Sequence, residues 1–446
     1  MMTFSQRLRS LYLQAPEQAA IYLQFTGRED LLLTREQLLR GASAYARTLQ
    51  SEGIQPGEVT VLILQHGEDL IYSFWGAILH GAIPSIMPFL TEKLSPERYR
   101  ADLAALIYVT KPVAIITYPE FETEARAALQ EGDSVRSVIV TDQVGAQLQL
   151  DFDSLQGFQR RPEDIVLLQH SSGTTGLQKG VALSHQAVFN QLHAYGKSLS
   201  LSEHDVIVSW LPLYHDMGLI AGFLMPVLSG IPVVIMSPFD WVRAPYKLLQ
   251  SVAKYRGTLT WLPNFAYNFC AQKIRDRHIE GLDLSSLRAI INCSEPVRWE
   301  SHLAFHERFK AYGLRLEVLQ TSYAMAENVF GVTQSQLGSL PRVEEIDREA
   351  FMVERVAKTP FDGRPSMKMM SSGQPLENVK VKVLDDHGNE VPDRVIGEIA
   401  LSSDCMLTGY FNRPDLSEKA FRDGWYLTGD YGYISTGEVF VSGRKK

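Results

Sequence analysis

The chain has 446 residues, of which 45% are hydrophobic, 21% charged and 10% aromatic, as in an ordinary globular protein with room for two or three packed units. Its 43 basic and 51 acidic residues give a formal net charge of −8, and no basic run occurs, so nucleic acid is not expected as the main partner. The three cysteines are widely spaced, which argues against a disulfide framework and favours a reducing, cytoplasmic setting.

The first two-thirds of the chain alternates segments with the patterns of helices and strands. A capping box at Thr34–Gln37 opens a helix that should end near Gly53. A buried strand is expected over Val59–Leu64, and a helix over about Asp69–His80 follows it. Further strands are expected at residues 81–87, 113–117, 137–141, 206–211, 233–236 and 289–292. This alternation predicts an α/β fold whose parallel sheets are covered by helices on both faces.

The segment Met217–Phe239 has no charged residue in 23 positions, which is long enough to resemble a membrane span. However, Pro226 and Pro232 interrupt it, and residues 231–236 are rich in β-branched side chains. A buried helix followed by a buried strand explains this pattern better. Membrane insertion is therefore not expected.

After about Ser371 the pattern changes to short strands. Residues Val379–Leu384 alternate with period two, Asp385–Asn389 has the composition of a turn, and Gly397–Ser402 is a further short strand. These segments predict a small antiparallel β-subdomain. The chain stops at Lys446, directly after another expected strand, which we interpret as a truncation.

The segment His170–Gly180 is the most informative part of the sequence. It reads His-Ser-Ser-Gly-Thr-Thr-Gly-Leu-Gln-Lys-Gly, between an apolar strand and a helix expected to begin near Ser184. Glycines let backbone N–H groups approach phosphate oxygens, hydroxyl groups donate to them, and Lys179 supplies positive charge. The glycine spacing is neither that of a Walker A loop nor that of a dinucleotide-binding fingerprint. A polar loop without a ligand is the alternative, but six successive Ser, Thr and Gly residues near a lysine favour phosphate binding.

This loop resembles the phosphate-binding signature of the adenylate-forming superfamily, which includes acyl-CoA synthetases, nonribosomal-peptide adenylation domains and firefly luciferase. Four other stretches resemble motifs of that superfamily in the expected order. Cys293–Pro296 is similar to a loop beside the adenine and the acyl carboxylate, and Tyr323–Glu327 to a motif whose tyrosine stacks on adenine and whose glutamate binds magnesium. Tyr426–Asp430 and Gly443-Arg444 are similar to segments whose aspartate and arginine reach the ribose. Five motifs in order make the resemblance specific.

Within the superfamily the chain is most similar to the fatty acyl-AMP ligases. Three stretches carry this narrower resemblance, namely Ser209–Ile220, Pro263–Cys270 and Ile346–Ala350. The last lies in an interval, from Glu327 to Gly373, that is longer than ordinary acyl-CoA synthetases have and resembles an insertion in that family. The resemblance implies that this insertion disfavours the rotation that admits CoA. The acyl-AMP then passes to the phosphopantetheine arm of an acyl carrier protein.

The activity implied by the resemblance is ATP-dependent conversion of a medium- or long-chain fatty acid to acyl-AMP, with release of pyrophosphate and with Mg²⁺ as cofactor. Thr175, Lys179 and His215 are expected to act in catalysis, and Glu327 is expected to act there and to ligate the metal. A fatty acid is already ionised at about pH 7, so no general base is required. The expected nucleotide-binding residues are Ser171, Ser172, Gly173, Thr174, Gly176, Ser294, Glu295, Pro296, Thr321, Ser322, Tyr323, Asp430 and Arg444.

The acyl chain is expected beside apolar or small residues in segments that border the acyl site in relatives. These residues are Met217, Gly218, Phe223, Met225, Phe265 and Ala266. An ordinary hydrophobic core is the alternative for each of them. For His215 and Asp216, a structural pair or a helix N-cap competes equally with a role in gating the substrate.

The resemblance also implies two helix-flanked, mostly parallel sheets plus a small antiparallel β-subdomain. Residues 1–200 should form a first α/β subdomain with the phosphate loop, and residues 201–370 a second one with the acyl site, the adenine motifs and the insertion at about 335–370. Residues 371–446 should form the β-subdomain, ending at the hinge. The small C-terminal domain, which carries a lysine that stabilises the adenylation transition state, is expected to be absent. We therefore expect the chain to bind ATP and acyl-AMP but to form acyl-AMP slowly.

Three other functions compete with the fatty acyl-AMP ligase. An acyl-CoA synthetase would have the same fold and would deliver the acyl group to CoA. An amino-acid adenylation domain would need an acidic partner for the substrate ammonium, for which Asp240 is the nearest candidate. A non-catalytic module would bind ATP or acyl-AMP without turnover.

Overall fold

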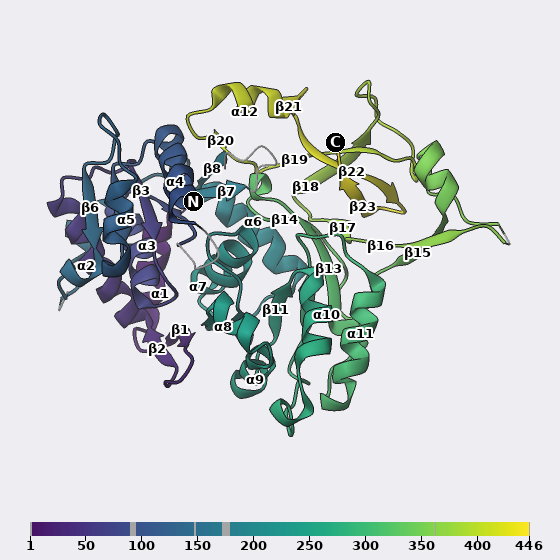
Figure 1. The fold of residues 1–446 in the computed structure, drawn as a ribbon, viewed down its shortest axis with the longest axis horizontal. Coiled ribbons are helices and arrows are strands. Elements are labelled where there is room, and N and C mark those ends of the chain that lie inside the picture. The colour runs from purple at the N-terminus through teal and green to yellow at the C-terminus, as the bar shows by residue number, and fades with distance from the viewer. Residues whose placement is uncertain (1, 90–94, 147–148, 172–178, 362, 446) are drawn as a thin grey trace.

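The structure of the protein is a computed structural model that describes residues 2–89, 95–146, 149–171, 179–361 and 363–445 (Figure 1). Two large sheets flanked by helices, a five-stranded antiparallel sheet and a two-stranded hairpin make up its β-structure. The expected α/β fold with an additional antiparallel subdomain is confirmed.

The first large sheet has seven strands in the order β20-β8-β7-β4-β3-β5-β6. Its parallel strands are β3 (Val59–Ile63), β4 (Ile83–Ile86), β5 (Ala114–Thr117), β6 (Ser137–Val140) and β7 (Ile165–Ser171). β8 (Lys179–Ser184) runs antiparallel to β7 and to β20 (Gly409–Tyr410). The sequence analysis did not anticipate β8: the phosphate segment is followed first by this strand, and α6 (His185–Ser198) begins only after it.

The helices of this first unit are α2 (Arg35–Ser51), α3 (Glu68–His80), α4 (Pro96–Thr110) and α5 (Glu122–Ala127). The capping box predicted at the start of α2 is confirmed, since the Thr34 hydroxyl accepts from the Gln37 N–H and the Gln37 side chain accepts from the Thr34 N–H. α3 ends at Gly81, whose φ of 93° lies in the left-handed region that glycine adopts without strain. The local sequence therefore determines where α2 begins and where α3 ends.

The second large sheet has nine strands in the order β17-β14-β13-β12-β11-β9-β10-β1-β2. They are β1 (Ala19–Gln24), β2 (Leu31–Thr34), β9 (Ile207–Ser209), β10 (Val233–Met236), β11 (Leu259–Leu262), β12 (Ala289–Asn292), β13 (Leu319–Ala324), β14 (Gly331–Gln334) and β17 (Gln374–Pro375). The central strands pair in parallel, and antiparallel strands lie at both edges. Besides α6, the other helices of the described chain are α1 (Phe4–Gln14), α7 (Met225–Ser229), α8 (Pro238–Arg243), α9 (Tyr246–Tyr255), α10 (Asn264–Lys273), α11 (Trp299–Phe309) and α12 (Pro414–Ala420).

Strand pairing links distant parts of the sequence. β1 and β2, from the range 1–200, extend the nine-stranded sheet through β10. β20, from the range 371–446, pairs with β8 of the seven-stranded sheet. The expected three-part division of the chain remains a prediction, but each of the large sheets includes strands from more than one of those ranges.

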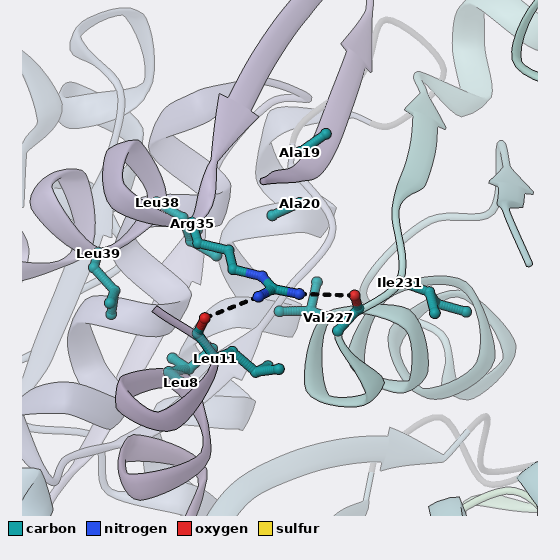
Figure 2. A pocket seen from close by; sticks show the side chains of 10 residues that line it. Leu8, Leu11, Ala19, Ala20, Arg35, Leu38, Leu39, Val227 and Ile231 are labelled. Carbon is teal, nitrogen blue, oxygen red and sulfur yellow. Dashed lines mark hydrogen bonds between the residues drawn. The ribbon is translucent and has the colours of Figure 1, made fainter. Parts of the chain in front are cut away.

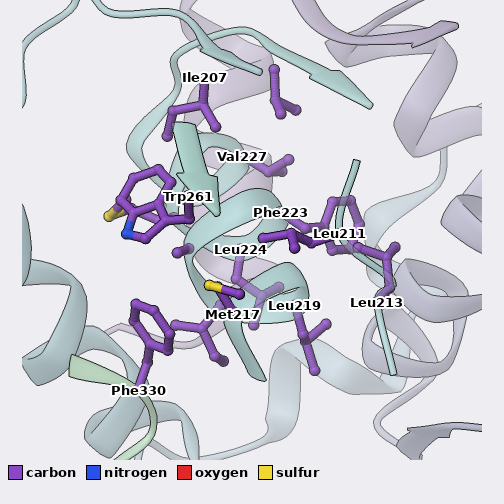
Figure 3. Close-up of a cluster of buried hydrophobic side chains, with 14 of the residues drawn as sticks. Ile207, Leu211, Leu213, Met217, Leu219, Phe223, Leu224, Val227, Trp261 and Phe330 are labelled. Carbon is purple, nitrogen blue, oxygen red and sulfur yellow. The ribbon is translucent and has the colours of Figure 1, made fainter. Parts of the chain in front are cut away.

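The uncharged segment Met217–Phe239 lies inside the protein. It begins with a π-helix over Met217–Leu224, continues as α7 and returns as β10, and Figure 3 shows the surrounding apolar cluster. A Cβ atom added at Gly218 would lie 2.2 Å from the Pro212 carbonyl oxygen, so only glycine permits this close approach. In the described residues, no helix is both long and apolar enough to cross a membrane.

Buried Arg35 joins three segments at the base of α2 (Figure 2). Its guanidinium donates to the Leu11 carbonyl oxygen at 2.8 Å and to the Gly230 carbonyl oxygen at 3.0 Å. The adjoining apolar cavity has a volume of about 10 Å³, which is space for about one water molecule. This arginine therefore closes the ends of α1 and α7 rather than forming a ligand site.

The β-subdomain is a sheet in the order β18-β19-β22-β21, with β23 also paired to β22. Its strands are β18 (Val379–Leu384), β19 (Gly397–Ser403), β21 (Phe421–Arg422), β22 (Trp425–Ser435) and β23 (Glu438–Arg444). The expected insertion contains a hairpin of β15 (Val343–Asp347) and β16 (Ser366–Met370), which projects at the edge of the molecule (Figure 1). A separate small core of Ile346, Ala357, Tyr433 and Phe440 joins the insertion to β22 and β23.

Candidate functional site

A cavity of about 530 Å³ lies where the two large sheets and the β-subdomain meet. It combines acidic, basic and tyrosine side chains from segments that are far apart in the sequence. Its lining residues are His170, Lys179, His215, Asp216, Ser294, Ala324, Met325, Ala326, Glu327, Glu398, Tyr410, Leu416, Lys419, Ala420, Tyr426, Leu427, Thr428, Gly429, Asp430, Arg444 and Lys445. The cavity thus brings together residues from all five of the motifs recognised in the sequence.

Glu327 is held in this cavity by a tyrosine that the sequence analysis did not select. The hydroxyl of Tyr410 donates to Glu327 Oε1 at 2.8 Å and lies 2.9 Å from the hydroxyl of Tyr426. Burial, followed by the negative charge of Glu327, raises the pKa of Tyr410 above its ordinary value, so the hydroxyl stays protonated as a donor. Of these two tyrosines, only Tyr426 could be found from the sequence, because it is the first residue of a recognised motif.

The backbone beside Glu327 is strained. β13 ends at Ala324, a short 3₁₀ turn covers Ala326–Asn328, and Val329 follows with φ 63° and ψ −58°. The N–H of Phe330 donates to the carbonyl of Asn328 at 2.6 Å, which completes a γ-turn of the rare, strained sign. A β-branched residue costs of order 1–3 kcal/mol in such a conformation. The surrounding structure, in which Val329 is fully buried, therefore holds this strained turn two residues after Glu327.

Asp430 is a second buried carboxylate that lines the cavity. Its Oδ2 accepts from the Tyr323 hydroxyl at 2.6 Å, and its Oδ1 lies 3.0 Å from Arg444 Nε. Burial raises the pKa of Asp430, while the Tyr323 hydrogen bond and the charge of Arg444 act in the opposite direction. Asp430 and Arg444 are paired by β22 and β23, in which they occupy opposite register positions. Tyr323 is buried and is not among the residues described as lining the cavity, and its stacking on adenine remains a prediction.

The phosphate segment is only partly described. Ser172, Gly173, Thr174, Thr175 and Gly176 lie outside the described residues, and Ser171 is placed by its backbone pairing with Lys179. The Lys179 ammonium lies 4.9 Å from the centroid of the Tyr410 ring, within the range of a cation–π interaction. Lys179 therefore reaches the same tyrosine that holds Glu327.

His170, the residue before this segment, lies at the wall of the cavity. Its Nε2 is 2.6 Å from the Ser85 hydroxyl, whereas its Nδ1 is buried and has no hydrogen-bond partner in the part of the chain that the structure describes. Burial lowers the pKa of His170 to about 4. The imidazole is therefore neutral at pH 7.

Replacing His170 with glutamine should reduce the sensitivity of the fold to acid. An unfolded histidine has a pKa of about 6.5, so the unfolded chain binds more protons than the folded one as the pH falls from that value toward 4. This linkage makes the free energy of unfolding fall over that window. We expect the variant to lose about 3 kcal/mol less than the unmodified protein between pH 7 and pH 4, as measured by urea denaturation. The control is the same replacement at the exposed His204. The prediction would be contradicted if the free energy of unfolding of His170→Gln fell with pH as steeply as that of the unmodified protein.

His215 and Asp216 form the structural pair and the helix N-cap that the sequence analysis gave as one of two alternatives. His215 Nδ1 lies 2.9 Å from Asp216 Oδ1, and this oxygen also accepts from the Met217 N–H at 2.8 Å. Asp216 is thus the N-cap of the π-helix, and its hydrogen bond raises the pKa of His215. Both side chains also line the cavity, and the role of His215 in gating the substrate remains a prediction.

The predicted adenine loop joins the cavity to α10. Ser294 lines the cavity with a φ of 67°, and Cys293 Sγ lies 3.0 Å from Met217 Sδ. Glu295 Oε2 accepts from the Phe265 N–H at 3.0 Å, where a carboxylate is favoured by the N-terminus of a helix. Pro296 continues this loop, whereas Thr321 and Ser322 are buried in β13. The Thr321 hydroxyl donates to the Ser371 carbonyl at 2.7 Å and that of Ser322 to the Thr333 carbonyl at 2.7 Å.

None of the predicted acyl-binding residues is among the residues described as lining the cavity. Met217, Gly218, Phe223, Met225 and Ala266 are buried, whereas Phe265 is 47% exposed. Phe223 packs on Phe74 and Trp75 with ring centroids 5.6 and 5.7 Å apart, as a core residue does.

Two tryptophans that the sequence analysis did not select neighbour Phe265. The rings of Trp210 and Trp241 stack at 3.6 Å, and the ring of Phe265 meets both edge-on. Asp240, the residue that an amino-acid substrate would require, is not among the residues described as lining the cavity. The acyl-binding roles remain predictions.

Glu327 fits a magnesium ion that is held mainly by phosphates. The described residues contain no cluster of three His, Cys, Asp or Glu side chains that could hold a metal ion alone. Mg²⁺, however, usually keeps several waters and is bound through one or two carboxylates together with substrate phosphates. A buried carboxylate with one oxygen already fixed by Tyr410, in the same cavity as Lys179, matches that mode of binding.

The chain is similar over most of its length to proteins of known families. A family model described as AMP-binding enzyme matches residues 13–411. A long-chain-fatty-acid–AMP ligase of Mycobacterium marinum is 29% identical over 436 residues, which cover 93% of this chain and 73% of that protein. A medium-chain-fatty-acid–acyl-carrier-protein ligase of Moorena producens is 29% identical over 459 residues, covering 98% of this chain and 75% of that protein. The crystal structure of a fatty acyl-adenylate ligase from L. pneumophila, in complex with acyl adenylate and pyrophosphate, is 30% identical with a TM-score of 0.88, covering 100% of this chain and 77% of that one.

Proposed function

Because this chain belongs to the AMP-binding enzyme family, we propose that it uses ATP to convert a medium- or long-chain fatty acid to acyl-AMP, releases pyrophosphate and passes the acyl group to an acyl carrier protein. The observation that carries this proposal is the convergence of Lys179, Glu327 and Asp430 on one cavity. A nucleoside triphosphate needs groups of these three kinds: an ammonium for its phosphates, a carboxylate for its metal ion and a carboxylate for its ribose hydroxyls. The names of the relatives, a fatty-acid–AMP ligase and a carrier-protein ligase, support the acid and the acceptor.

The reaction brings a fatty carboxylate to the α-phosphate of ATP, so two anions must approach each other. Lys179, with the residues of the phosphate segment, would hold the β- and γ-phosphates, and Asp430 would accept hydrogen bonds from the ribose hydroxyls beside Arg444. Glu327 would hold Mg²⁺, whose chemistry is to neutralise phosphate charge as a Lewis acid. Alignment and charge neutralisation provide the catalysis, since the attacking carboxylate is already ionised at about pH 7.

The first test is whether the chain binds an acyl adenylate and makes one. Binding of a non-hydrolysable acyl-sulfamoyl-adenosine is measured by calorimetry, and ATP–pyrophosphate exchange is measured with fatty acids and with amino acids. We expect tight binding of the fatty acyl analogue and exchange that depends on a fatty acid. Exchange stimulated only by an amino acid would overturn the choice of substrate, and binding without any exchange would identify a nucleotide-binding module.

The acceptor is tested separately. The protein is given fatty acid and Mg·ATP with either CoA or a phosphopantetheinylated carrier protein, and the thioester products are separated by mass. We expect the acyl thioester of the carrier protein as the product, in keeping with the hairpin insertion of β15 and β16. Thioester formed on CoA alone would instead identify an acyl-CoA synthetase.

We place the protein in the cytoplasm, which suits its three buried free cysteines.

A further inference from the structure

Tyr410 lies where the seven-stranded sheet, the nine-stranded sheet and the β-subdomain meet. Its backbone belongs to the seven-stranded sheet, because Tyr410 pairs with Val181 in β8, two positions after Lys179. The flanking N–H groups of Thr408 and Phe411 donate to the carbonyls of Ala182 and Gly180 at 2.9 and 2.8 Å. The backbone of Tyr410 is therefore fixed to the strand that leaves the phosphate segment.

The side chain of Tyr410 reaches from that sheet to the other two parts. Its hydroxyl donates to Glu327 Oε1, beyond the end of β13 in the nine-stranded sheet, and contacts the Tyr426 hydroxyl in the β-subdomain. The Lys179 ammonium lies over its ring. A second link ties the same two segments, since the Leu407 N–H donates to the Glu327 carbonyl at 2.8 Å.

We propose that Tyr410 is a positioning residue that sets the Glu327 carboxylate and the Lys179 ammonium at a fixed separation for the phosphates of ATP. This inference rests on the proposed acyl-AMP formation. A buried carboxylate needs hydrogen-bond donors, and a donor on Oε1 also fixes the direction of Oε2. Groups that orient a metal-binding carboxylate commonly affect metal affinity or activity 10- to 100-fold.

The variant Tyr410→Phe keeps the ring beneath Lys179 and removes only the hydroxyl. We expect the affinity for Mn²⁺, measured by paramagnetic resonance in the presence of a non-hydrolysable ATP analogue, to fall about 10-fold or more. The maximal rate of fatty-acid-dependent pyrophosphate exchange should fall with it, while the KM for the fatty acid stays unchanged. A matched control is Tyr99→Phe, which removes another buried tyrosine hydroxyl, bonded to the Pro88 carbonyl at 2.5 Å. This control should leave Mn²⁺ affinity unchanged.

A double-mutant comparison separates positioning from general destabilisation. In a Glu327→Gln background, Tyr410→Phe should cause little further loss of Mn²⁺ affinity, because the carboxylate through which Tyr410 acts is already gone. An equal loss in both backgrounds, or an unchanged affinity in the single variant, would refute the proposal. If Tyr410→Phe does not fold, Tyr426→Phe replaces it: removing the second partner of the Tyr410 hydroxyl should weaken Mn²⁺ binding in the same direction, and no change would count against the proposal.

The unmodified protein distinguishes the two levels of inference. If it neither binds the acyl-adenylate analogue nor catalyses exchange with fatty acids, the proposed function is wrong and the role of Tyr410 fails with it. If it does both and Tyr410→Phe behaves like the unmodified protein, only the role of Tyr410 is wrong.

Discussion

Replacing Glu327 with glutamine is expected to lower the rate of fatty-acid-dependent pyrophosphate release by about 100-fold. The amide has the same shape and still accepts the Tyr410 hydrogen bond, but it lacks the negative charge that a magnesium ion requires. The loss should therefore appear in the Mg²⁺ dependence of the rate, with half-maximal activity moved to higher Mg²⁺ concentration. The KM for the fatty acid should change little, because Glu327 is not among the residues expected to contact the acyl chain. The measurement is the initial rate of pyrophosphate release over a magnesium titration.

The control for this variant is Glu300→Gln, which removes an exposed carboxylate on α11 and should leave the magnesium dependence as it is. Thermal unfolding of both variants checks that the fold is retained. A Glu327→Gln protein that keeps full activity at low Mg²⁺ would show that Glu327 does not hold the metal. The assignment of Glu327 would then have to be abandoned.

The sequence predicted the residues of the local motifs that line the cavity better than the residues and strand pairings that position them. Glu327, Asp430 and Arg444 belong to local motifs whose order along the chain could be recognised, and all three line the cavity. Tyr410 could not be found in this way, since β20 has two residues and its pairing with β8 joins segments more than 200 positions apart. Such a pairing depends on the assembled core and leaves no periodic pattern in the sequence.

The two large sheets show the same limit. Alternating helices and strands predicted parallel sheets correctly, because a βαβ unit is local in sequence. β1 nevertheless pairs with β10, more than 200 positions away, and β2 joins the same sheet through β1. No periodicity in the sequence could indicate the pairing of β1 with β10. The predicted helix and strand of Met217–Phe239 are confirmed, but burial alone does not separate core residues from an acyl pocket.

The cavity, the strained turn and the insertion belong to one connected frame. β22 carries Asp430 at its middle and Tyr433 and Ser435 near its end, and β23 carries Phe440 and then Arg444. Tyr433 and Phe440 stack at 4.7 Å in the small core shared with the insertion. The insertion is thus attached to the two strands that hold the expected ribose-binding residues.

Replacing Glu344 with alanine is expected to lower the free energy of unfolding by about 3 kcal/mol and to release the insertion from those strands. Glu344 is buried in β15, where Arg342 lies 2.6 Å from Oε1 and Arg394 lies 3.1 Å from Oε2. The hydroxyls of Ser435 and Tyr433 donate to the same carboxylate at 2.7 and 3.2 Å. Removing it leaves two arginines without their common partner and two buried hydroxyls without an acceptor. Urea denaturation measures the loss of stability.

Hydrogen exchange locates the effect of Glu344→Ala. Amides of β15, β16 and residues 350–358 should exchange faster, while those of the seven-stranded sheet should keep their protection, because local opening costs less than global unfolding. The comparison variant is Glu345→Ala, which removes the exposed neighbour on the opposite face of β15 and should leave both measurements nearly unchanged. If Glu344→Ala destabilises the whole chain evenly, with no preferential exchange in the hairpin, the buried carboxylate supports the general core rather than the attachment of the insertion to β22 and β23.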